Sequence, residues 1–182
     1  MEEKKTILVF GGSQGARTIN ETFCSVMESL PAVTPWQAIH ITGREGSQAL
    51  KARYARLSFP VFVSEYQENM ADVYSLADIV IGRSGAGTVT ELGLLGIPAI
   101  LIPYPHANNH QYENARVLER QKTGAIIQEK DLKADILRDK IFSGMEQSSS
   151  REENRKRLKD DFTADALGLL VPEIEQLVRV PS

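Results

Sequence analysis

The sequence is poor in cysteine, and this scarcity argues against two classes of small protein. Cys24 is the single cysteine among 182 residues, so neither a disulfide-stapled fold nor a cysteine-ligated zinc site is expected. Cys24 falls in a segment predicted to be helical. A small, buried side chain in the core is therefore a better interpretation of Cys24 than a nucleophile.

Long apolar runs are also lacking. The apolar run Ile97–Ile102 is too short to span a bilayer. The N-terminal residues Met1–Lys5, four of which are charged, lead directly into a short apolar segment, which is unlike a secretory signal peptide. We therefore expect a cytoplasmic protein.

An excess of basic residues is absent as well. The formal net charge is −3, so the chain has no global positive field that would attract nucleic acid or an anionic membrane. Hydrophobic residues make up 42% and charged residues 25% of the sequence, which is ordinary for a globular protein. A chain of this length can bury a core without metals or disulfides.

The sequence also lacks several motifs that bind nucleotides or metals. It contains neither the G-x-G-x-x-G pattern of dinucleotide-binding folds nor the G-x-x-x-x-G-K-[ST] loop. It has no Asp-x-Asp pair of the kind that presents a divalent metal to a diphosphate, and no zinc-ligand spacing. We therefore expect no tightly bound metal or cofactor. Any charge on a bound diphosphate would be balanced by helix ends, backbone N–H groups and Arg83.

What the sequence does contain is a regular alternation of short apolar runs and helical patterns. Because these runs are apolar on both faces, they predict a parallel sheet covered on both sides, and hence a Rossmann-like, doubly wound α/β domain. The predicted strands are Thr6–Phe10, Trp36–Thr42, Pro60–Ser64, Asp78–Ile81, Pro98–Ile102 and Gly124–Ile127. The predicted helices between and after them are Ala16–Leu30, Glu45–Leu57, Asn69–Ala77, Thr88–Leu95, His110–Gln121 and Asp131–Phe142.

Two regions are expected along the chain. Residues 1–145 form the sheet domain, and His40, within a strand, is expected to be a satisfied core histidine. Ser143–Ser150 reads as a linker, and residues 146–182 as a helical extension packed on the domain. That extension would hold a charged helix at Arg151–Asp161 and an amphipathic helix at Ala164–Val178.

The first candidate binding segment is the glycine-rich turn after the first strand. In open α/β sheets, ligands bind at the carboxyl ends of the strands. Glycines at Gly11–Gly15 permit close backbone approach, and the helix start that follows suits a diphosphate. The candidate residues are Gly12, Ser13, Gln14 and Gly15. A simple tight turn explains the same glycines equally well.

The second candidate segment follows the fourth strand and opens another helix. Its candidate residues are Arg83, Ser84, Gly85, Ala86, Gly87, Thr88, Val89, Thr90 and Glu91. Glu91 could accept hydrogen bonds from both hydroxyls of a ribose. It is also three residues after Thr88, so the two could form a capping box instead. Arg83 could be an ion-paired arginine with no ligand.

Two further segments complete the candidate site. His110 and Gln111 lie where the loop after the fifth strand enters a helix, and both can exchange hydrogen bonds with sugar hydroxyls. Asn108 or Asn109 could cap that helix. In the segment after the third strand, the backbone at Gln67 could pair with a base and Met70 could pack on it.

Three motifs together resemble one family. GGSQGARTIN at Gly11–Asn20, ADIVIGRSGAGTVTELGLLGIPAILIPYP at Ala77–Pro105 and NNHQYENAR at Asn108–Arg116 are similar to the C-terminal domain of the MurG family. These enzymes are the peptidoglycan N-acetylglucosaminyltransferases of glycosyltransferase family 28. The resemblance is strong over about residues 5–130 and loose in the helical tail.

The resemblance implies a fold, a substrate and roles. This chain would be the donor-binding half of a GT-B fold that holds UDP-N-acetylglucosamine (UDP-GlcNAc). The parent enzymes transfer the sugar with inversion to a lipid-linked muramoyl-pentapeptide during cell-wall synthesis, at the cytoplasmic face of the membrane. Matched by position, Ser13 and residues 86–90 contact the diphosphate and Gln67 and Met70 the uracil. Glu91 matches the ribose-binding glutamate, and Gln111, beside His110, the sugar-binding glutamine.

The chain departs from the family in length. The N-terminal acceptor-binding domain of the family, with its lipid-linked ligand and the general base expected there, has no match in this sequence. We therefore expect a chain that binds the donor but does not transfer it alone. Without the resemblance, the residues indicate only that the chain binds a nucleotide or a sugar nucleotide. A subunit of a two-component transferase, a UDP-sugar epimerase and a nucleotide- or NAD-binding module remain alternatives.

Overall fold

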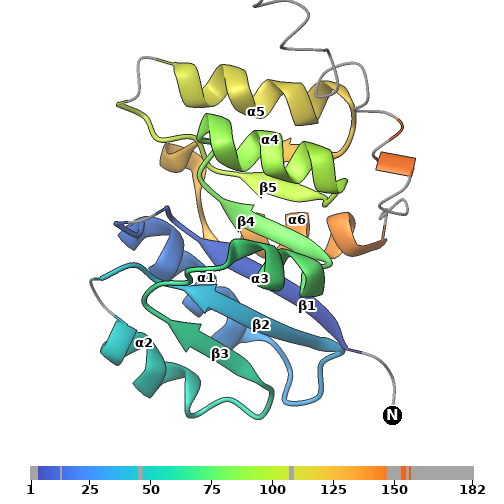
Figure 1. Cartoon of the computed structure of the whole chain (residues 1–182). Coiled ribbons are helices and arrows are strands. Elements are labelled where there is room, and N and C mark those ends of the chain that lie inside the picture. Colours follow the sequence, from blue (N-terminus) through green and yellow to red (C-terminus); the bar gives the residue numbers. More distant parts are fainter. Residues whose placement is uncertain are drawn as a thin grey trace, which may run out of the picture.

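The computed structural model describes residues 4–12, 14–44, 47–106 and 109–146, together with 153, 154 and 156. The predictions for Ser13, for Asn108 and for the two helices between 151 and 178 therefore fall wholly or largely outside the described residues. The six described strands form one parallel sheet in the order β3-β2-β1-β4-β5-β6 (Figure 1). The predicted doubly wound α/β fold is confirmed.

Strands and helices alternate along the chain. The strands are β1 (Lys5–Phe10), β2 (Trp36–Ile41), β3 (Val61–Ser64), β4 (Ile79–Gly82), β5 (Ala99–Leu101) and β6 (Gly124–Ile126). The helices are α1 (Arg17–Ser29), α2 (Ser47–Tyr54), α3 (Met70–Leu76), α4 (Ala86–Leu95), α5 (His110–Arg120), the short 3-10 helix η1 (Glu129–Asp131) and α6 (Ala134–Glu146). No helix in this described part is long and apolar enough to cross a membrane.

Two apolar layers cover the sheet. Successive side chains of a strand point to opposite faces. On β1, Ile7 and Val9 pack in a cluster with α1, α2 and α6, whereas Leu8 and Phe10 pack with α3, α4 and α5. Figure 1 shows α3, α4 and α5 on the near side of the sheet. Because both faces of β1, β4 and β5 are buried, these central strands carry no polar alternation, and the sequence therefore predicts them.

The strand order reverses at β1. Strand β1 pairs in parallel with β2 on one side and with β4 on the other. The connections that follow β1 and β4 therefore diverge to opposite faces, which leaves a crevice at their carboxyl ends. This is the topological switch point of the sheet.

Several helix boundaries differ from the prediction. Helix α2 ends at Tyr54 instead of Leu57, and helix α6 begins at Ala134 instead of Asp131. Helix α4 begins at Ala86, two residues before the predicted start, with Gly85 at its N-cap. Helix α6 runs to Glu146, so the predicted linker is wrong for residues 143–146. A side chain at Gly144 would meet Ile79 Cδ1 at 2.8 Å. The glycine therefore allows close packing of α6 on the sheet, where the sequence pattern suggested a break.

Few residues of the predicted C-terminal extension are described. Asn154 is one of them, and its side chain is 2% exposed. Its amide donates a hydrogen bond to the carbonyl of Gly96, at the C-cap of α4, at 3.0 Å. The extension therefore has at least one buried contact with the sheet domain.

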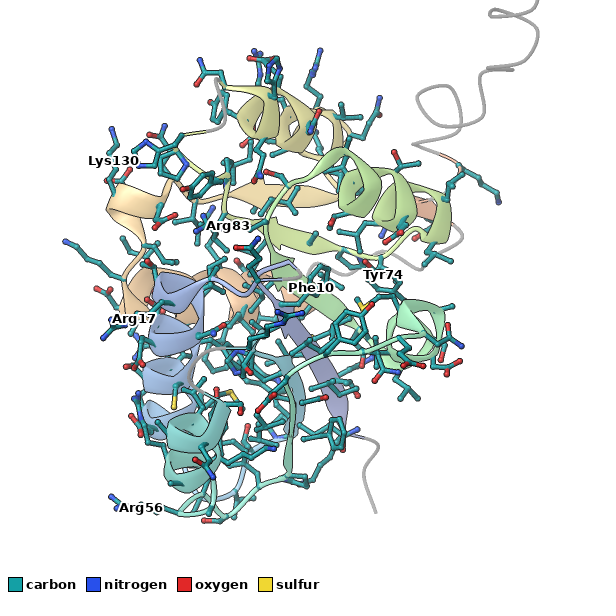
Figure 2. All side chains as sticks on the ribbon, turned by 60° about the vertical axis from the view of Figure 1, so that its left-hand side comes forward. Phe10, Arg17, Arg56, Tyr74, Arg83 and Lys130 are labelled. Carbon is teal, nitrogen blue, oxygen red and sulfur yellow. The ribbon has the colours of Figure 1, made fainter. Side chains whose placement is uncertain are left out.

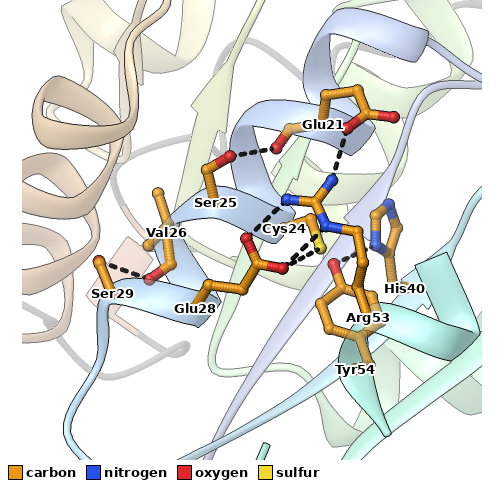
Figure 3. A network of polar contacts seen from close by, with 9 residues as sticks. All are labelled: Glu21, Cys24, Ser25, Val26, Glu28, Ser29, His40, Arg53 and Tyr54. Carbon is orange, nitrogen blue, oxygen red and sulfur yellow. Dashed lines mark hydrogen bonds and ion pairs between the residues drawn. The ribbon is translucent and has the colours of Figure 1, made fainter. Parts of the chain in front are cut away.

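His40 is a satisfied core histidine, as predicted, and Figure 3 shows its contact with Tyr54. Its Nδ1 is 2.8 Å from the Tyr54 hydroxyl and its Nε2 is 3.1 Å from Asn20 Oδ1. Asn20 donates through Nδ2 to the carbonyl of Thr42. Cys24 is also fully buried, and burial raises the pKa of its thiol to about 11. A nucleophilic role for Cys24 is therefore disfavoured.

Burial of His40 predicts a pH-dependent stability. Burial lowers the pKa of the imidazole from 6.5 to about 4 in the folded state. Between these values the unfolded chain binds a proton that the folded chain excludes, so the free energy of unfolding falls as pH falls. This contribution reaches about 3 kcal/mol at pH 4. Urea unfolding from pH 7 to pH 4 measures it.

The matched variants isolate the His40 contribution. We expect His40→Gln to lose about this much of the pH dependence, whatever its stability at pH 7. His106→Gln removes an exposed histidine and should keep the wild-type slope. Equal slopes for the wild type and His40→Gln would contradict the assignment.

Candidate functional site

A cavity of about 400 Å³ opens at the switch point. Its walls come from the carboxyl ends of β1 and β2, the segment after β3, helix α3 and the start of α4. Seven of the predicted site residues line it: Gly12, Gln67, Met70, Gly85, Gly87, Thr88 and Glu91. Segments that are distant in sequence thus meet where the parallel topology predicts.

The start of α4 offers backbone N–H groups to this cavity. The N-cap residue, Gly85, has no side chain that could cap the helix. The N–H groups of the first turn can therefore still donate hydrogen bonds, and they carry the partial positive charge of a helix start. Side chains added at Gly85 or Gly87 would meet nothing within 4 Å. These glycines therefore do not serve tight packing, and they leave open space beside the helix start.

Ser84, just before that helix, is buried, and its hydroxyl makes no hydrogen bond within the described part of the chain. Its side chain is 0% exposed. Its carbonyl accepts a bond from Asn114 Nδ2 at 3.1 Å, which ties the turn to α5. A buried hydroxyl without a partner costs stability. Packing alone therefore does not account for a serine at this position.

The first glycine turn combines a structural glycine with an open one. Gly12 has φ +90° and Gly15 has φ +82°, a conformation that favours glycine, and Gly15 N donates to Gly12 O at 2.9 Å. A side chain at Gly15 would collide with the Thr42 carbonyl, whereas one at Gly12 would meet nothing. Gly15 and Gln14 line a separate cavity beside Asn20 and Thr42. Ser13 lies outside the described residues.

The capping-box interpretation of Thr88 and Glu91 is wrong. Because α4 begins at Ala86, Thr88 lies inside the first turn and cannot be the N-cap. Glu91 instead accepts a hydrogen bond from the Tyr74 hydroxyl through Oε2, at 2.8 Å. Glu91 is exposed and lines the cavity, so its carboxylate can also meet a ligand.

Tyr74 is a site residue that the sequence reasoning missed. It is 3% exposed, and its ring packs edge-on against Phe10 with centroids 6.1 Å apart (Figure 2). Burial, followed by the hydrogen bond to Glu91, raises the pKa of its phenol well above the ordinary value. Tyr74 therefore remains a neutral donor that orients the Glu91 carboxylate. No local sequence motif predicts the contact between Tyr74 and Glu91, which are 17 residues apart.

The remaining residues of the second segment do not line the cavity. Ala86 and Thr90 are exposed elsewhere on α4, and Val89 is 3% exposed in the apolar core. Arg83 is ion-paired: its Nη1 lies 2.5 Å from Glu129 Oε2, and its side chain is 12% exposed. The ion-paired alternative for Arg83 is thus the one observed.

The third segment lies outside the switch-point cavity. His110 is exposed, and Gln111 accepts a bond from the Tyr104 backbone N–H through Oε1, at 2.9 Å. A cavity of about 440 Å³ lies beside them, lined by Tyr104, Asn109, Tyr112, Glu129 and other residues of these loops. Asn109 occupies the N-cap of α5 with φ 62° but makes no side-chain capping bond. The capping expectation is therefore wrong for Asn109.

The fourth segment forms the outer wall of the switch-point cavity. Gln67 donates through Nε2 to the Asn69 carbonyl at 3.2 Å, and Asn69 Oδ1 caps α3 by accepting from Ala71 N. The side chains of Gln67 and Met70 are half-buried. Three carboxylates line the cavity with them, those of Glu65, Glu68 and Glu91. Within the described residues, no group of His, Cys, Asp and Glu side chains gathers as metal ligands would.

Comparison with known proteins identifies a family. The model of the glycosyltransferase family 28 C-terminal domain matches residues 6–170. A relative from Halalkalibacterium halodurans is 34% identical over 94% of this chain and 48% of its own length. One from Coxiella burnetii is 40% identical over 72% of this chain and 37% of its own length. Both are named UDP-N-acetylglucosamine–N-acetylmuramyl-(pentapeptide) pyrophosphoryl-undecaprenol N-acetylglucosamine transferase.

A solved structure agrees with these relatives. The crystal structure of Acinetobacter baumannii MurG superposes with a TM-score of 0.77 at 28% identity, over 95% of this chain and 52% of that chain. This chain thus spans about half the length of the relatives that it matches.

The starts of α3 and α4 yield a stability prediction. Asn69→Ala removes an observed N-cap and should lower the free energy of unfolding by about 1 kcal/mol. Thr88→Ala removes no cap, so it should cost less than about 0.5 kcal/mol. Urea unfolding of the two variants measures these costs. A loss at Thr88 as large as that at Asn69 would restore the capping-box interpretation.

Proposed function

Because this chain belongs to glycosyltransferase family 28, we propose that it binds UDP-GlcNAc at the switch point and serves as the donor half of an inverting glycosyltransferase. The observation that carries the proposal is the convergence of Gly12, Gln67, Gly85 and Glu91 on one cavity. The names of the relatives supply the identity of the donor and of the acceptor class.

The cavity suits the nucleoside end of the donor. Met70 and the backbone at Gln67 form a wall on which a uracil ring can lie. Glu91 offers a carboxylate to the ribose hydroxyls, with one oxygen already held by Tyr74. A carboxylate oriented in advance binds hydroxyls at a lower entropic cost than one that is free to rotate.

The diphosphate is proposed to lie across the two helix starts. Helices α1 and α4 both begin at the carboxyl edge of the sheet, after turns that hold Gly12 and Gly85. Backbone N–H groups and the helix dipoles supply positive potential there. The sugar would then extend toward Gln111, whose Oε1 is held by the Tyr104 backbone.

These groups would assist transfer by stabilising the leaving group. A hydroxyl of the acceptor attacks the anomeric carbon, the bond from that carbon to the diphosphate oxygen breaks, and UDP departs with the bonding electrons. The helix starts face the charge that develops on UDP. The proton of the attacking hydroxyl passes to a general base, which we expect on the acceptor side of the complete enzyme.

The acceptor is proposed to be the lipid-linked muramyl-pentapeptide in the relatives' name. Such a substrate would place the complete enzyme at the membrane surface, peripherally on its cytoplasmic face. The acceptor would be bound by an N-terminal domain or by a partner subunit.

Calorimetric titration with UDP, UDP-GlcNAc and NADH tests the proposal. We expect heat with the two uridine ligands and none with NADH. Binding of NADH alone would favour the dinucleotide module instead. Release of an epimerised sugar on incubation with UDP-GlcNAc would favour an epimerase.

The Glu91 carboxylate yields a sharper prediction. Glu91→Gln should weaken UDP binding about tenfold, because a hydrogen bond to a charged group contributes about 1.5–3 kcal/mol. It should also remove the preference for UDP over 2′-deoxy-UDP. Tyr74→Phe should weaken UDP binding by a smaller factor, about threefold, since it removes only the orienting donor.

A control variant lies on the opposite face of the sheet. Asp139 is an exposed carboxylate of α6, and Asp139→Asn should bind UDP like the wild type. If Glu91→Gln keeps both its affinity and its preference for the 2′-hydroxyl, Glu91 does not bind the ribose.

A further inference from the structure

Arg83 and Glu129 join loops that are far apart in the sequence. The guanidinium Nη1 of Arg83 lies 2.5 Å from Glu129 Oε2, 3.2 Å from the Ile102 carbonyl and 3.3 Å from the Pro103 carbonyl. The side chains of Arg83 and Glu129 are 12% and 22% exposed. One largely buried cation therefore connects the β4–α4 turn, the β5–α5 loop and η1.

Glu129 extends this connection to the first glycine turn. Its second oxygen, Oε1, accepts a hydrogen bond from Thr18 Oγ1 at 3.0 Å. Thr18 is in the first turn of α1, directly after the segment that contains Gly12. The ion pair thus spans the two helix starts that are proposed to face the diphosphate.

Tyr104 carries the connection toward the proposed sugar side. Arg83 Cζ lies 5.3 Å from the centroid of the Tyr104 ring, within the range of a cation–π contact. The Tyr104 backbone N–H holds Gln111 through Oε1. Displacement of Arg83 would therefore be transmitted to Gln111 through a single residue.

The charge of Arg83 is already compensated. A guanidinium paired at 2.5 Å with a carboxylate adds little net positive potential at a neighbouring phosphate, because the opposite charges cancel at a distance. Removing one partner would leave the other as an unpaired, poorly solvated charge. These facts favour a geometric role over a direct contact with the ligand.

We infer that the Arg83–Glu129 ion pair is the positioning element of the donor site, setting the spacing between the α1 and α4 helix starts and the Tyr104–Gln111 loop. The inference rests on the proposed function, since the donor that it positions is UDP-GlcNAc. Arg83 is a positioning residue here, and it does not touch the diphosphate.

The Glu129→Gln variant separates the two roles of Arg83. If the pair sets geometry, both Glu129→Gln and Arg83→Met weaken UDP-GlcNAc binding about tenfold, and the double variant is no worse than either single one. If Arg83 instead contacts the diphosphate, Glu129→Gln frees its charge and UDP binds as tightly as before or more tightly. That result overturns the inference.

Arg53 supplies a matched control for stability. Its guanidinium forms ion pairs with Glu21 and Glu28 on α1 (Figure 3). None of these three residues lines the switch-point cavity. Arg53→Lys should lower the thermal midpoint without changing the affinity for UDP-GlcNAc. If Glu129→Gln loses stability but keeps its affinity, the ion pair of the wild type has only a structural role. That result also overturns the inference.

A ligand-free measurement keeps the inference distinct from the proposed function. In amide NMR spectra of the unliganded protein, Glu129→Gln should shift the resonances of Thr18, Gly85 and Gln111 together, whereas Arg53→Lys should leave them in place. If the wild type binds no UDP but these resonances move, the proposed function fails, and the ion pair still sets the spacing of the three segments. If they do not move together, the positioning role fails even where UDP binds.

Discussion

Strand β1 pairs in parallel with both β2 and β4, and this double pairing fixes the edge at which all the candidate residues meet. In the register, Phe10 aligns with Ile41 on one side and with Gly82 on the other. The turns that follow Phe10 and Gly82 therefore start from adjacent points and diverge to opposite faces. Without this reversal in strand order, the glycine turn before α1 and the start of α4 would not lie beside the same cavity.

The glycines of these turns divide into two physical classes. At Gly15, Gly43 and Gly82 an added side chain would collide with neighbouring backbone atoms, so these positions serve chain packing. At Gly12, Gly85 and Gly87 it would meet nothing within 4 Å, yet all three line the cavity. Glycines that face open space at a helix start are what close approach of a ligand to the backbone requires.

Much of this architecture could be predicted from local sequence. The strands were found because runs such as Ile79–Ile81 are apolar on both faces and end in glycine. The sequence places the start of α4 too late because Gly85 and Gly87 flank Ala86, and glycine has a weak helix propensity. Packing of Val89 and Leu92 on the sheet overrides that weakness.

The contacts that organise the site could not be predicted in this way. The Tyr74–Glu91 bond and the Arg83–Glu129 pair join side chains from separate elements. Neither pair has a spacing that a helix or turn would impose, so no local pattern reveals them. Thr88 and Glu91, by contrast, do have a capping-box spacing, and they mislead because the helix begins two residues earlier.

The charges that line the cavity determine which end of a nucleotide it would accept. Of its described lining residues, Glu65, Glu68 and Glu91 are acidic and none is basic. Such a wall repels a diphosphate and accepts hydroxyls, so a nucleotide would bind with its ribose here and its phosphates toward the helix starts. The nearby cation of Arg83 is neutralised by Glu129. The attraction for the phosphates then comes from backbone N–H groups, whose strength depends on the orientation of two helices. A site of this kind depends on geometry more than on charge, which is why an ion pair that fixes the geometry matters as much as a group that touches the ligand.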